Sequence, residues 1–64
     1  MCEITVFINE NGTSKRIARS IVKVDAGEGC VSLLHSSGRV IKVDGTIILT
    51  VDLLKNEIAL KKND

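Results

Sequence analysis

The first twelve residues, Met1-Cys2-Glu3-Ile4-Thr5-Val6-Phe7-Ile8-Asn9-Glu10-Asn11-Gly12, carry a strand pattern followed by a turn signal. From Cys2 to Ile8 every second side chain is aliphatic or a thiol, which is the period of a β-strand with one buried face. Asn11-Gly12 predicts a hairpin turn, because both residue types tolerate a positive φ. We therefore expect a strand over residues 2–8 and a returning strand from Thr13.

The remaining chain alternates runs of β-branched and aliphatic residues with turn signals. The runs predict strands at 13–17, 21–24, 30–34, 39–43, 46–54 and 57–60. Between them we expect turns at 26–29, 35–38 and 55–56, a second hairpin at Asp44-Gly45, and a polar tail over 61–64. Residues 18–20 are expected to bend, although the spacing of Ile17 and Ile21 leaves a helical turn open there.

Six or seven short strands with regularly spaced turns predict an all-β fold, a small antiparallel barrel formed by residues 1–64 as one domain. The chain has 64 residues, 44% of them hydrophobic, and one aromatic residue, Phe7. The core must therefore consist of Ile, Val and Leu. A chain this short buries only ~60% of its unfolded surface, so we expect an exposed apolar patch and, covering it, a homodimer.

The charge pattern argues against several classes of protein. The formal net charge is +1, and aromatic stacking residues typical of nucleic-acid binding are absent from the sequence apart from Phe7. An RNA-binding barrel remains the alternative, supported by Lys15, Arg16, Arg19, Lys61 and Lys62. There is no apolar run of the ~20 residues that a membrane span needs and no secretory signal. We expect a cytoplasmic protein, not bound to membranes, with reduced thiols.

Catalytic motifs are not evident, and we expect a protein that is not an enzyme. The acidic residues fall mainly at predicted turns or on polar strand faces, and Gly27-x-Gly29 lacks the rest of a dinucleotide-binding loop. Cys30 lies in an apolar strand, where a free cysteine behaves as a small buried hydrophobe. His35 is expected to be a solvated turn residue.

Cys2 differs from Cys30 because of its position. A residue this small after the initiator normally permits removal of Met1, which would leave a free α-amine and a thiol on adjacent carbons. These two groups close a five-membered ring on a metal ion, and the amide nitrogen of Glu3 can add a third donor. Nitrogen and sulfur donors in one plane suit Ni(II) or Cu(II) better than Zn(II). Two Cys2 residues in a dimer would supply four donors, while a simple strand start remains the other interpretation.

Several segments resemble the CooT family, namely Met1-Cys2-Glu3, the strand through Val6, Asn11-Gly12, Ile21-Val22-Lys23-Val24, the strand ending at Gly38, Val51-Asp52-Leu53-Leu54 and Glu57-Ile58-Ala59-Leu60. The resemblance spans essentially the whole chain, and Met1-Cys2-Glu3 is its distinctive part. It implies a small SH3-like β-barrel homodimer that binds nickel and assists the maturation of nickel carbon-monoxide dehydrogenase. Some relatives are described as predicted RNA-binding proteins. Carried over by motif, the nickel ligand is Cys2.

The leading hypothesis is therefore a metallochaperone-like accessory protein. It would hold Ni(II) through Cys2 at a homodimer interface and pass it to an apo nickel enzyme. The alternatives are a small RNA-binding barrel and a module whose apolar patch serves self-association alone.

Overall fold

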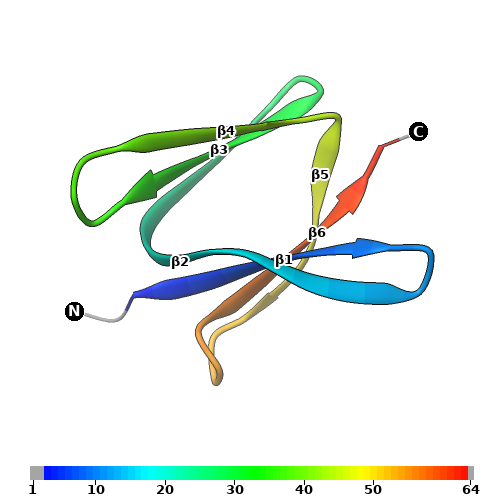
Figure 1. Ribbon diagram of the computed structural model, residues 1–64, viewed down its shortest axis with the longest axis horizontal. Coiled ribbons are helices and arrows are strands. Elements are labelled where there is room, and N and C mark those ends of the chain that lie inside the picture. Colours follow the sequence, from blue (N-terminus) through cyan, green and yellow to red (C-terminus); the bar gives the residue numbers. More distant parts are fainter. Residues whose placement is uncertain (1–2, 64) are drawn as a thin grey trace.

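Six β-strands make up most of residues 3–63, the part of the chain that the computed structural model describes (Figure 1). They are β1 (Ile4–Glu10), β2 (Thr13–Gly27), β3 (Cys30–His35), β4 (Val40–Asp44), β5 (Thr46–Asp52) and β6 (Glu57–Lys62). The strands form one sheet in the order β4-β3-β2-β1-β6-β5, which curls into a half-barrel. The predicted small all-β barrel fold is confirmed. Within residues 3–63, helices long and apolar enough to cross a membrane are absent.

The core lies on the concave face of the sheet and is entirely aliphatic. Its buried members are Val6, Ile21, Val31, Leu33, Ile58 and Leu60. Ile4 and Ile8 pack against this cluster from the same face as Val6, as the alternation in the first strand predicted. The hydroxyl of the buried Thr46 donates to the carbonyl of Val43 at 3.0 Å, so its polar atom has a partner inside the apolar core.

The predicted turn at Asn11-Gly12 forms at its expected place. Asn11 and Gly12 join β1 to β2 with φ values of 54° and 76°, the left-handed conformation that Asn-Gly favours. β1 runs to Glu10 and β6 to Lys62, so both are two residues longer at their ends than expected, and the predicted tail begins later. Cys2, which starts the predicted first strand, lies outside the described residues.

β2 replaces the two separate strands that were predicted between Thr13 and Val24. It is continuous over 15 residues, so the alternative of a helical turn is wrong. Its first part pairs with β1 and its second with β3, and the register shifts at three points along it. Ser20 has a φ of 60°. Bulges of this kind bend a strand and increase its twist. The bend lets β2 pair with β1 along its first part and with β3 along its second part.

The predicted hairpin at Asp44-Gly45 is wrong. β4 and β5 lie at opposite ends of the strand order, and Gly45, with a φ of 70°, makes a corner between them. The N–H of Gly45 donates to the carbonyl of Gly29 at 2.6 Å, and its own carbonyl accepts from the N–H of Asn63 at 2.7 Å. These distant partners direct the chain across the half-barrel, whereas a hairpin would have turned it back on β4.

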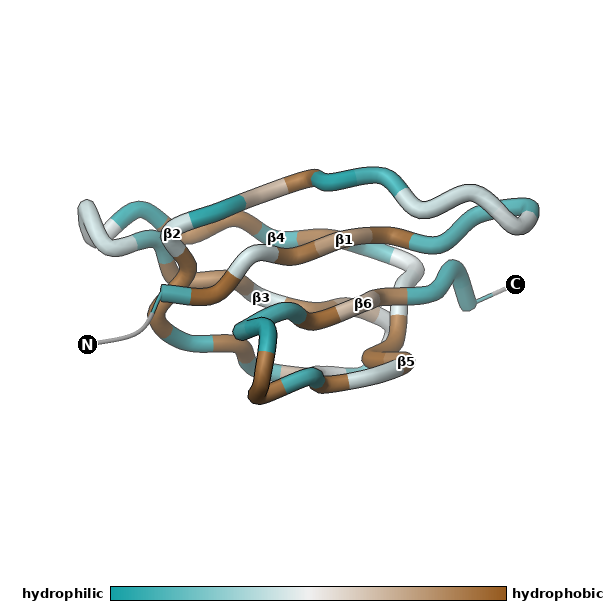
Figure 2. Tube along the Cα trace, turned by 90° about the horizontal axis from the view of Figure 1, so that it is seen from below, coloured by the Kyte–Doolittle hydropathy of each residue, from teal (hydrophilic) through white to brown (hydrophobic). Residues whose placement is uncertain are grey.

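β1 and β6 pair in parallel, with Val6 opposite Ile58 and Ile8 opposite Leu60. The other four strand pairings within residues 3–63 are antiparallel. β1 is therefore enclosed between β2 and β6 (Figure 1). The hydropathy view shows the apolar stretches along these strands and polar stretches at the β1–β2 turn (Figure 2).

The backbone at Ser20 generates the first prediction. A left-handed conformation costs a residue with a Cβ roughly 1–2 kcal/mol, and glycine removes that cost but adds ~0.5–1 kcal/mol of chain entropy. We expect Ser20→Gly to leave the free energy of unfolding unchanged or slightly raised. The matched control Ser14→Gly, at an exposed β2 position, should lower it by ~0.5–1 kcal/mol. Urea unfolding at one protein concentration measures both, and equal losses would contradict the role given to Ser20.

Candidate functional site

The predicted ligand Cys2 lies outside the described residues, but the chain that follows it is held firmly. Glu3 has an exposed side chain, and β1 begins at Ile4. The N–H of Thr5 donates to the carbonyl of Asn56 at 3.0 Å, while Ile4 pairs with β2 on the other side. The start of β1 therefore has a fixed position between two neighbouring strands.

His35 lies at the end of β3, two strands away from the start of β1. Ile4 pairs with Ile21, and Ile21 pairs with His35. The N–H of Ser37 donates to Nδ1 of His35 at 3.0 Å, and the Ser37 Oγ lies 2.8 Å from the same nitrogen. Because a main-chain N–H can only donate, Nδ1 of the neutral ring is unprotonated and already engaged. His35 is therefore the half-buried last residue of β3 and not the solvated turn residue that was expected, although its ring stabilises the turn that follows.

Cys30 is a free, half-buried cysteine at the start of β3. It pairs with Gly27 across one hairpin and with Asp44 across the next. Its sulfur lies only 3.3 Å from the position that a Cβ on Gly27 would occupy, so the thiol packs against bare backbone. The structure thus favours a packing role for Cys30. In residues 3–63, groups of three or more His, Cys, Asp or Glu side chains arranged to hold a metal are absent.

Uncovered apolar side chains are present, as the composition predicted. Five large aliphatic side chains between residues 47 and 54 are exposed, at 42% for Ile47, 46% for Leu49, 54% for Val51, 79% for Leu53 and 98% for Leu54. The exposed fraction rises toward the turn between β5 and β6. In Figure 2 this turn projects from the edge of the sheet, with apolar segments on its outside.

The turn that carries Leu53 and Leu54 is organised by Asp52. One carboxylate oxygen of Asp52 accepts the N–H of Leu54 at 3.0 Å and that of Lys55 at 3.1 Å. This is the way in which aspartate stabilises a turn. Asn56 then adopts a φ of 53° and passes the chain to β6. The spacing Asp-x-x-x-Asn over residues 52–56 was the sequence signal that could have revealed this role of Asp52.

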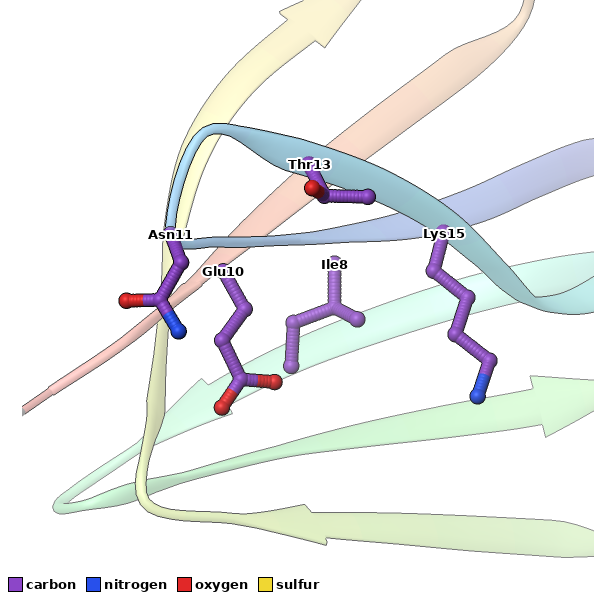
Figure 3. A pocket seen from close by; sticks show the side chains of 5 residues that line it. All are labelled: Ile8, Glu10, Asn11, Thr13 and Lys15. Atoms are coloured by element: carbon purple, nitrogen blue, oxygen red, sulfur yellow. The ribbon is translucent and has the colours of Figure 1, made fainter.

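The opposite end of the molecule, around the β1–β2 turn, holds two shallow hollows. One, of about 220 Å³, is lined by Ile8, Glu10, Asn11, Thr13 and Lys15. Figure 3 shows the side chains of Glu10 and Lys15 pointing the same way on either side of Ile8. The other, of about 300 Å³, is lined by Asn9, Glu10, Asn11, Lys61 and Lys62. Asn9 Oδ1 beside it is buried and lacks a hydrogen-bond partner among the described residues.

The basic residues behind the RNA-binding alternative are all exposed, but they do not form a uniform positive surface. Nζ of Lys62 lies 3.6 Å from Oε2 of Glu10, and Glu10 lines both hollows. Phe7 pairs with Arg16 on β2 and is half-buried, so its ring offers little free face for a stacked base. The arrangement gives the RNA-binding alternative little support.

The six-stranded, strongly curved sheet defines a small β-barrel protein. Comparison with known families places it more closely. The family model described as CO dehydrogenase accessory protein CooT matches residues 1–61, and the chain belongs to the CooT family. The predicted family is thereby confirmed, and with it an accessory role toward CO dehydrogenase.

A solved structure agrees with the family assignment. A crystal structure from Carboxydothermus hydrogenoformans, described as a CooT protein, matches with a TM-score of 0.83 and 22% sequence identity. The match covers 98% of this chain and 100% of the other. At this level of identity the likeness establishes the shared fold. Curated proteins gave no match.

The turn at Asp52 can be tested directly. Asp52→Ala removes the acceptor for two main-chain N–H groups, and we expect the free energy of unfolding to fall by about 1 kcal/mol. Asp52→Asn keeps an oxygen in the same place and should retain most of that stability. Chemical unfolding of both variants measures the difference. A loss of the same size in Asp52→Asn would contradict the hydrogen-bonding role and indicate a dependence on charge.

Proposed function

We propose that this protein is a nickel carrier of the cytoplasm that binds Ni(II) through Cys2 and delivers it to an apo CO dehydrogenase. The observation that carries the proposal is the family match over residues 1–61, a range that includes Cys2. Nickel is here the cargo of the protein and not a catalytic group. The protein itself performs no chemical conversion in this proposal.

The donor chemistry of the N-terminus supports nickel in particular. Once Met1 is removed, Cys2 offers an amine and a thiolate, and the following amide nitrogen completes a set of three donors in one plane. A second chain can supply the remaining position. Such nitrogen and sulfur sets suit ions that prefer planar coordination, whereas Zn(II) prefers a tetrahedron. Binding requires the amine and the thiol to lose their protons. Their reference pKa values are ~8 for the amine and ~8.5 for the thiol.

The position of β1 supports a role in transfer. A carrier has to present its metal where a recipient protein can reach the ligands. Cys2 is two residues from Ile4, whose place is set by the pairing of β1 with β2, and neighbouring Glu3 is exposed. Ligands attached to a fixed strand start, next to an exposed residue, suit hand-over of the ion.

The RNA-binding alternative predicts a different behaviour. Contacts with phosphates release counterions, so binding of single-stranded RNA would weaken steeply as salt concentration rises. Nickel binding at Cys2 has no such requirement. A salt titration with a short RNA therefore separates the two functions.

The Cys2 site is tested by substitution. We expect Cys2→Ala to abolish stoichiometric Ni(II) binding in isothermal titration calorimetry. The substitution removes the thiolate donor, and without it the five-membered ring with the α-amine cannot close. Cys30→Ala is the matched control, and it should bind nickel as the wild type does. Circular dichroism should show that both variants retain the β fold.

The mature N-terminus is checked in the same material. Intact mass spectrometry should show loss of Met1, and native spectra should show one nickel ion for two chains. Unchanged nickel binding by Cys2→Ala would overturn the proposed function. A wild-type protein that keeps Met1 and still binds nickel tightly would overturn the participation of the α-amine.

A further inference from the structure

The hollow of about 300 Å³ near the β1–β2 turn is lined by residues from both ends of the chain. The parallel pairing of β1 with β6 brings residues 9–11 beside Lys61 and Lys62. The two lysines outnumber the single carboxylate in the lining, that of Glu10, so the hollow is positive overall. Asn9 and Asn11 add amide groups to its wall. This site is called the basic hollow below.

One polar atom of the basic hollow is buried without a partner. Oδ1 of Asn9 makes no hydrogen bond among residues 3–63, although Asn9 lies directly opposite Lys61 in the strand pairing. A buried acceptor without a donor costs free energy, and folded proteins rarely keep one without a reason. An amide oxygen can only accept, so the partner that it lacks must carry an N–H or O–H group.

The lysines of the basic hollow are only weakly neutralised. Nζ of Lys62 lies 3.6 Å from Oε2 of Glu10, and these side chains are 50% and 53% exposed, so water screens the attraction between them. Lys61 forms no ion pair with a carboxylate in residues 3–63. A carboxylate that enters the hollow therefore meets one uncommitted ammonium group and one that is loosely held.

An extended acidic peptide satisfies both features of the hollow at once. Its carboxylates can pair with the lysines, and its main-chain N–H groups supply the donor that Oδ1 of Asn9 lacks. An isolated phosphate or carboxylate ion brings acceptors alone and leaves that oxygen unpaired. RNA carries a negative charge on every nucleotide, and it would meet the carboxylate of Glu10, which lines both hollows.

We propose that the basic hollow binds an extended acidic segment of a partner protein. A carboxylate of the segment pairs with Lys61 and Lys62, and one of its main-chain N–H groups donates to Oδ1 of Asn9. This inference goes beyond the proposed nickel function, because it does not require nickel to bind at Cys2.

Glu10 competes with the ligand for Lys62. When an acidic side chain enters, the Glu10 carboxylate has to leave Lys62. It can then turn toward Lys15, the basic residue of the neighbouring hollow of about 220 Å³. Figure 3 shows the side chains of Glu10 and Lys15 pointing the same way on either side of Ile8. The ligand thus displaces Glu10 without leaving its charge far from a cation.

The basic hollow and the proposed metal ligand lie at opposite ends of β1. Ile4 begins this strand and Glu10 ends it, and a strand of this length spans about 20 Å. A short segment bound in the hollow therefore leaves the start of β1 free. Both sites can be occupied at the same time, which suits a protein that acts on a larger partner.

The experiment measures the fluorescence polarisation of a labelled peptide of Glu-Gly repeats as the full chain is added. A peptide of Gln-Gly repeats has the same main chain without carboxylates, and a uridine oligonucleotide of equal length tests the RNA alternative. Lys61→Met and Glu10→Gln alter the basic hollow. Lys23→Met and Asp25→Asn are the matched controls, because Lys23 and Asp25 form an exposed ion pair of the same 3.6 Å length on β2.

We expect the wild type to bind the Glu-Gly peptide at least about tenfold more tightly than the Gln-Gly peptide. Lys61→Met should weaken this binding about fivefold, as loss of a partly exposed ion pair does, and Lys23→Met should leave it unchanged. Glu10→Gln should tighten it about threefold, because it removes the competing charge and keeps the side-chain shape. Asp25→Asn changes the net charge equally and should not tighten it.

Asn9→Val tests the buried oxygen separately from the charges. In the free protein it removes an unpaired buried acceptor, so the midpoint of urea unfolding should rise. It should also weaken binding of the Glu-Gly peptide about fivefold, because the peptide N–H loses its acceptor. Thr5→Val, near the start of the same strand, should leave peptide binding unchanged. Unchanged peptide binding by Asn9→Val would overturn the role given to the Asn9 oxygen and would indicate water as its partner.

Three further results would overturn the inference. Equal binding of the two peptides would remove the role of the carboxylates. Equal losses in Lys61→Met and Lys23→Met would indicate general attraction by charge. Tighter binding of the oligonucleotide, with a steep dependence on salt, would assign the hollow to RNA.

The inference and the proposed function fail in different measurements. Circular dichroism checks the fold of every variant, and calorimetry with NiCl₂ should show that Lys61→Met and Asn9→Val bind nickel as the wild type does. Absence of peptide binding with normal nickel binding would overturn the acidic-segment site alone. Unchanged nickel binding in Cys2→Ala would overturn the proposed function and leave peptide binding unaffected.

Discussion

The pairing of β1 with β6 is the constraint on which the rest of the structure depends. These strands come from the two ends of the chain, and their contact places Val6 against Ile58 and Ile8 against Leu60 in the core. β2 holds the other side of β1. A strand enclosed in this way has little freedom to move at its ends, because its main-chain groups are hydrogen-bonded on both sides. The start of β1 thus has a fixed place in the sheet.

Local signals predicted the strands and turns well but did not predict their partners. The alternation in the first strand reflects the direction of successive side chains, and the Asn11-Gly12 turn reflects the φ preference of two residues. Both properties are local, so the neighbouring sequence is enough to predict them. Asp44-Gly45 carries an equally strong turn signal and yet makes a corner. The direction of that corner comes from hydrogen bonds of Gly45 with Gly29 and Asn63, residues that are far away in sequence. The parallel pairing of β1 with β6 was unforeseen for the same reason.

The metal chemistry of the candidate site stays a prediction, and its surroundings could be predicted only in part. The role proposed for Cys2 comes from its position near the start of the chain, which can be read directly from the sequence. Composition predicted an apolar patch, because a short chain cannot cover so many aliphatic side chains. It could not say which ones stay uncovered. Val51 has the alternation of a core residue, and it is exposed because β5 is the last strand of the sheet.

The two ends of the half-barrel differ in chemistry, and that difference bears on the proposed function. The end around the β1–β2 turn gathers polar and charged groups of both signs, including Glu10 and Lys62. The end where β1 starts has an exposed acidic residue, Glu3, and the uncovered leucines of the β5–β6 turn. A protein that only stored a metal would gain from burying its ligands under such leucines. A protein that delivers a metal, as proposed, needs ligands that its recipient can reach, and the exposed side chain of Glu3 beside the start of β1 agrees with that need.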